Sequence, residues 1–98
     1  MKMPDKVKIG GLTYAVNLTD VLHNGAGFDG EIHYDKCEIR IRPQGEARMQ
    51  LILCHEVLHG VYEHLGYSNH DEKQIDELAR ALYALVVDNP ELFNGNTS

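Results

Sequence analysis

The sequence has no tryptophan, only two cysteines and three prolines among its 98 residues, and no long apolar run. A membrane-spanning helix needs about 20 mainly apolar residues, so none is predicted. Residues 1–5 are not followed by the apolar core of a signal peptide. Cys37 and Cys54 do not form a C-x-x-C pair. We expect two free, buried thiols, as is usual in a reducing cytoplasm.

Runs of lysine or arginine are also missing, and the formal net charge is −6. Nucleic-acid binding depends on clustered cationic side chains that neutralise phosphates. An acidic surface is also not attracted to anionic membranes. We therefore expect neither nucleic acid nor a membrane among the partners of this chain.

The residues that are present predict one small α+β domain over 1–98, with loose ends at 1–5 and 94–98. The first half carries four β-type runs in two pairs, at residues 7–9, 12–18, 31–34 and 37–41. Their alternation predicts a small antiparallel sheet of three to four strands with one wet face. The charged last run is the candidate for an edge strand that pairs with an extended peptide.

The second half predicts two antiparallel helices, over residues 46–65 and from about residue 71 to Val87, separated by a turn at 66–70. Asp71 or Asn69 can cap the second helix. In the first helix, apolar residues at helical spacing form the stripe expected to face the core: Ala47, Leu51, Cys54, Leu58, Val61, Tyr62 and Leu65. In the second helix the corresponding stripe is Ile75, Leu78, Ala79, Leu82, Leu85 and Val86.

The first helix contains His55-Glu56-Val57-Leu58-His59, which matches the zinc-binding pattern H-E-x-x-H. Histidines at i and i+4 present two imidazoles to one point on a helix face, as a tetrahedral zinc requires. Glu56 is rotated about 60° from His59, and we place it on the side away from the apolar stripe. There it would hold a zinc-bound water, accept its proton and pass that proton to the leaving amine.

A third metal ligand is expected from the second helix, because Glu72 and Asp76 both border its apolar stripe. The spacing Glu72-x-x-x-Asp76 is that of gluzincins, where Glu binds zinc and Asp orients a ligand histidine. Counting outward from a turn centred near Ser68 instead favours Asp76 as the direct ligand. Both acids also suit the start of a helix without any metal, so the sequence leaves the choice open.

Tyr67 and His70 lie in the turn directly after the motif helix. Either side chain could donate a hydrogen bond to the oxyanion that develops during peptide hydrolysis. The alternative is that both are ordinary turn residues with exposed rings.

Taken together, HEVLHG at 55–60, EKQIDELA at 72–79 and Asp88-Asn89-Pro90 resemble the small phage and prophage metallopeptidase-like proteins akin to the ImmA/IrrE family, sometimes described as minimal gluzincins. The resemblance covers roughly residues 31–93. It implies a small sheet packed on the active-site helix, a bound Zn²⁺, and the cytoplasm of a bacterium or phage-infected cell. Larger members of the family cleave transcriptional repressors, which implies a bacterial or phage regulator as one class of substrate.

The sequence thus predicts a zinc metallo-endopeptidase, with His55 and His59 holding zinc together with Glu72 or Asp76. Its substrate would be a protein or peptide bound in extended form across the sheet edge. The alternative is a non-enzymatic phage accessory protein that keeps zinc for structure and acts by binding a partner. A third possibility is a metal-free fold in which the motif is accidental.

Overall fold

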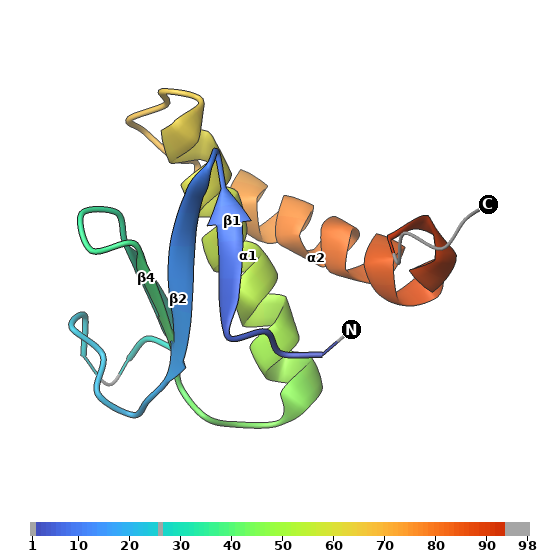
Figure 1. The fold of residues 1–98 in the computed structure, drawn as a ribbon, viewed down its shortest axis with the longest axis horizontal. Helices are drawn as coiled ribbons and strands as arrows, with labels where there is room; N and C mark the ends of the chain where they lie inside the picture. Colours follow the sequence, from blue (N-terminus) through green and yellow to red (C-terminus); the bar gives the residue numbers. More distant parts are fainter. Residues whose placement is uncertain (1, 26, 94–98) are drawn as a thin grey trace.

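The computed structural model describes residues 2–25 and 27–93 and has the predicted α+β class (Figure 1). Its elements are β1 (Lys6–Ile9), β2 (Leu12–Leu18), β3 (Gly30–His33), β4 (Glu38–Ile41), α1 (Glu46–His64), α2 (Glu72–Asp88) and the short 3₁₀ helix η1 (Pro90–Leu92). Among the described residues, no helix is long and apolar enough to cross a bilayer. The predicted loose end at 94–98 lies outside the described residues.

Two hairpins form where the β-type runs are paired. Gly10 and Gly11 connect β1 to β2 with φ values of 57° and 86°, a left-handed conformation that glycine adopts without strain. Residues 34–37 connect β3 to β4. Cys37 lies in this turn with a φ of 49°, so its expected place in a strand is wrong. Both cysteines are free, as predicted.

The sheet is mixed, with strand order β1-β2-β4-β3, and the expectation of a purely antiparallel sheet is wrong. β2 and β4 run parallel, with Val16 opposite Ile39. The reason is that β3, which follows β2 along the chain, does not lie next to β2 but one strand position further out. The second hairpin then returns β4 into that gap. β4 is therefore an inner strand and not the expected edge, and the outer strands are β1 and β3.

The core lies between one face of the sheet and α1, and α2 packs on α1 beyond the sheet (Figure 1). The buried cluster contains Ile9, Tyr14, Val16, Ile39, Ile41, Ile52 and Leu53. Each large apolar side chain buried here contributes roughly 1.5–3 kcal/mol to folding. At the described part of the N-terminus, Asp5 accepts a hydrogen bond from the Val16 amide, and Met3 packs against the cluster.

The predicted stripe of α1 is only partly correct. Leu65 is 62% exposed, whereas Ile52 and Leu53, outside the stripe, are buried. α1 is covered on two sides, by the sheet and by α2, so its buried residues do not form a single stripe. In α2 itself only Ile75 and Ala79 are fully buried, because in the described part of the chain this helix packs on α1 and otherwise contacts only the short η1.

Candidate metal centre

Three side chains converge where α1 and the start of α2 meet. His55 Nε2 lies 3.2 Å from Glu72 Oε2, and His59 Nε2 lies 2.9 Å from Glu72 Oε1. The two Nε2 atoms are 3.2 Å apart. Zinc bonds of about 2.0–2.1 Å at tetrahedral angles separate ligand atoms by about 3.3 Å. The three donors therefore fit the ligand set of a zinc site.

The position of Glu72 is fixed because it is the first residue of α2. Asp71 caps the helix by accepting hydrogen bonds from the Lys73 and Gln74 amides at 3.0 and 3.3 Å. A cap of this type contributes roughly 1 kcal/mol to helix stability. The first residue of α2 is thereby presented to the two histidines of α1.

Asp76 occupies a different position, one helical turn further on. Its Oδ1 lies 3.7 Å from Nδ1 of His55, the ring nitrogen that points away from the cluster, and its Oδ2 accepts a hydrogen bond from Arg80 Nε at 2.9 Å. The hydrogen bond from Arg80 lowers the pKa of the Asp76 carboxyl. Of the two acids that the sequence left open, Glu72 faces the cluster and Asp76 lies behind His55.

Glu56 is on the sheet side of α1 and only 8% exposed, so its predicted place away from the core is wrong. Glu56 faces β3, because it lines a cavity together with Gly30 and Ile32 of that strand. A Cβ built on Gly30 of β3 would lie 3.4 Å from Glu56 Oε2. Burial, followed by the charges of Glu72 and Glu31, raises the pKa of Glu56 to about 8.

His70 contacts His59 on the side away from the cluster. His59 Nδ1 and His70 Nδ1 are 2.8 Å apart, and His70 Nε2 lies 2.9 Å from the Tyr67 carbonyl oxygen. The carbonyl can only accept, so His70 Nε2–H donates and its Nδ1 accepts from His59. This chain of hydrogen bonds directs the lone pair of His59 Nε2 toward Glu72. Burial lowers the pKa of His59.

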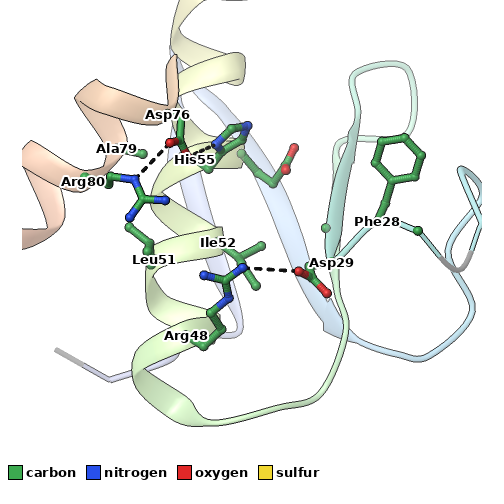
Figure 2. A pocket seen from close by; sticks show the side chains of 12 residues that line it. Phe28, Asp29, Arg48, Leu51, Ile52, His55, Asp76, Ala79 and Arg80 are labelled. Carbon is green, nitrogen blue, oxygen red and sulfur yellow. Dashed lines mark hydrogen bonds and ion pairs between the residues drawn. The ribbon is translucent and has the colours of Figure 1, made fainter. Parts of the chain in front are cut away.

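Two cavities adjoin the cluster. The β3 cavity, of about 460 Å³, lies between His55, His59 and Glu72 on one side and residues of β3 and the preceding loop on the other. The arginine cavity, of about 240 Å³, is lined by Arg48 and Arg80 and lies beside His55 and Asp76 (Figure 2). Glu56 lines both cavities.

The two candidate donors after α1 have different surroundings. His70 is close to the cluster, but both ring nitrogens are engaged. Tyr67 is 58% exposed, its ring packs at 5.6 Å from that of Tyr62, and it lines neither cavity.

Tyr34, which the sequence did not single out, does line the β3 cavity and donates a 3.4 Å hydrogen bond to the His59 carbonyl. Burial, with nearby acids, raises its pKa to about 12.

Glu31 of β3 is a second residue that the sequence analysis missed. It is 3% exposed, and its carboxylate accepts hydrogen bonds from the His23 and Asn24 amides, both at 2.9 Å, and pairs with the His33 ring. Burial alone would raise its pKa, but the hydrogen bonds from Asn24, His33 and His23 lower it to about 2. Its burial depends on a contact between segments, since the amides that its carboxylate binds belong to the loop before β3.

The chain matches no protein-family model, and comparisons with curated proteins and with solved structures give no match. The resemblance to the ImmA/IrrE family therefore stays a hypothesis. What the site can do is argued from its own geometry.

Proposed function

We propose that this protein is a zinc-dependent metallopeptidase that hydrolyses bonds in a protein or peptide substrate. The observation that carries the proposal is the convergence of His55, His59 and Glu72 beside the buried carboxyl of Glu56. Three protein donors with an adjacent acid or base form the usual arrangement of a catalytic zinc site.

The histidines and Glu72 would hold the ion, and zinc when bound would supply a Lewis acid for the substrate carbonyl and for the attacking water. Glu56 takes the proton from that water and delivers it to the leaving amine. Asp76 and His70 orient the two imidazoles through their Nδ1 atoms.

The substrate would bind in extended form along β3. This strand pairs with β4 on one side only, and its residues Gly30 and Ile32 line the β3 cavity next to Glu56. A peptide strand added to that edge passes directly by the metal cluster. To donate to a developing oxyanion, the hydroxyl of Tyr34 in the same cavity would give up its 3.4 Å hydrogen bond to the His59 carbonyl.

The non-enzymatic alternative requires a closed site with four protein ligands. In the described part of the chain, the only group of three or more His, Cys, Asp or Glu donors that meets this geometry is His55, His59 and Glu72. Asp76 and His70 contact the ring nitrogens that face away from it. A set of three donors favours the enzyme over the structural zinc protein.

Metal analysis together with a cleavage assay tests the proposal. Purified, dialysed protein should contain one zinc per chain. His59→Ala should lose the metal, whereas the matched change His64→Ala, at an exposed histidine of the same helix, should keep it. Glu56→Gln should retain zinc but lose at least about a hundredfold in cleavage of an unfolded protein substrate. Zinc-free wild type, or full cleavage by Glu56→Gln, would contradict the proposal.

A further inference from the structure

We propose that the arginine cavity binds a carboxylate of the substrate, so that the enzyme prefers peptides with an acidic group close to the bond it cleaves. This inference rests on the proposed peptidase function and names the substrate class of the same site. The cavity also borders His55 and Glu56, but the inference concerns its two arginines, which have no part in the metal cluster.

The cavity is built from three segments around His55. Arg48 reaches it from the first turn of α1, Arg80 from α2, and the loop before β3 contributes Phe28 and Asp29 (Figure 2). Its volume of about 240 Å³ is below the roughly 300–1,000 Å³ of pockets for drug-sized ligands. A single substrate side chain or chain terminus is therefore the occupant that fits.

Both arginines have N–H groups available for further hydrogen bonds. Arg80 uses only Nε for Asp76, and no partner is found for its two terminal nitrogens among the described residues. Arg48 meets Asp29 at 3.5 Å, and the two side chains are 55% and 48% exposed. Exposed ion pairs of this kind are weak, so a substrate carboxylate can replace Asp29 with little loss. The planar guanidinium group matches a carboxylate with two parallel hydrogen bonds.

The acidic groups of the cavity do not favour a cationic substrate side chain. Asp76 is paired with Arg80 and faces His55, and Asp29 faces Arg48. A lysine or arginine entering the cavity would approach two guanidinium groups, and the carboxylates that contact them, Asp29 and Asp76, are already paired. Leu51 and Ile52 form an apolar wall, and an apolar side chain is the competing occupant.

The carboxylate could come from an internal Glu or Asp or from the free C-terminus of a peptide. Probes that separate these sources are alanine-based hexapeptides with a single Glu at successive positions and blocked ends, their Gln counterparts, and an alanine hexapeptide with a free or amidated C-terminus. Binding is measured by calorimetry on zinc-loaded Glu56→Gln protein, which is not expected to cleave them.

At one position of the scan, the Glu peptide should bind about tenfold more tightly than the Gln peptide, as expected of one charge-assisted hydrogen bond. A preference for the free over the amidated terminus instead would identify the chain end as the source. Arg48→Gln should reduce the preference several-fold, and the pair with Arg80→Gln should abolish it. Lys8→Gln, an equal charge change on the exposed side of β1, should leave it intact.

Zinc content is measured for every variant, because Arg80 holds Asp76, whereas Arg48 contacts no metal ligand. Equal binding of the acidic and neutral probes by Glu56→Gln protein that keeps both arginines would overturn this inference. If wild type cleaves Glu and Gln peptides at equal rates, the peptidase proposal stands and the carboxylate preference fails. If the acidic probes bind preferentially but wild type cleaves none of them, the carboxylate site stands and the peptidase proposal fails.

Discussion

At the scale of single residues, the site depends on side chains that touch the ligand histidines from behind. Asp76 faces Nδ1 of His55, while Glu72 faces Nε2. Replacing Asp76 with Ala removes the carboxylate that orients the ring, so zinc affinity should fall about 10- to 100-fold. Competition with a chromophoric chelator measures this change. Glu77→Ala, at an exposed neighbour on the same helix, should leave affinity unaltered, and equal losses in both variants would contradict the assigned role.

The buried carboxylate of Glu31 leads to a prediction about how the stability of the fold depends on pH. Its folded pKa of about 2 lies below the ordinary value of 4.5. The carboxylate therefore stabilises the fold fully above about pH 5, and this contribution is lost as pH falls through 4.5 toward 2. Glu31→Gln should cost about 2 kcal/mol at pH 6 and much less at pH 3, as measured by urea unfolding. Asp35→Asn, in the exposed turn of the same hairpin, is the control. A cost for Glu31→Gln that is equal at both pH values would refute this account.

At the scale of elements, the site depends on how closely β3 approaches α1. A Cβ at Gly30 would lie 2.6 Å from Ile52 Cγ2, a methyl group held close to the helix backbone that cannot move aside easily. Gly30→Ala should therefore destabilise the protein by roughly 1–3 kcal/mol and push β3 away from Glu56. Gly27→Ala, where nothing lies within 4 Å of the new Cβ, should have little effect. Equal thermal stability of the two variants would contradict this packing argument.

At the scale of the whole molecule, a bound ion would link α2 to the rest. α2 packs on α1 and fully buries only Ile75 and Ala79, while Glu72 and the histidines span the two helices. Zinc at 100 times its dissociation constant would add about 2.7 kcal/mol, which raises Tm by about 10 °C or more in a chain of this size. Thermal unfolding with and without chelator measures the shift. His59→Ala should show none, and a chelator-insensitive wild type would contradict the link.

Local features of this protein could be read from the sequence alone. The i, i+4 spacing of His55 and His59 puts both rings on one helix face, Asp71 is one of the two caps expected for α2, and two glycines turn the first hairpin. Each depends on interactions within a few residues along the chain, so composition and spacing suffice to predict it.

The tertiary structure alone decided what depends on distant segments. The parallel pairing of β2 with β4 follows from the path of the loop at 19–29. The burial of Glu56 follows from covering α1 on two sides, and the choice of Glu72 over Asp76 follows from where α2 begins beside α1. Arg48 and Arg80, 32 positions apart by their numbers, share a cavity only because α2 packs on α1. Such contacts join residues far apart in sequence, and no local pattern of side chains encodes which of them meet.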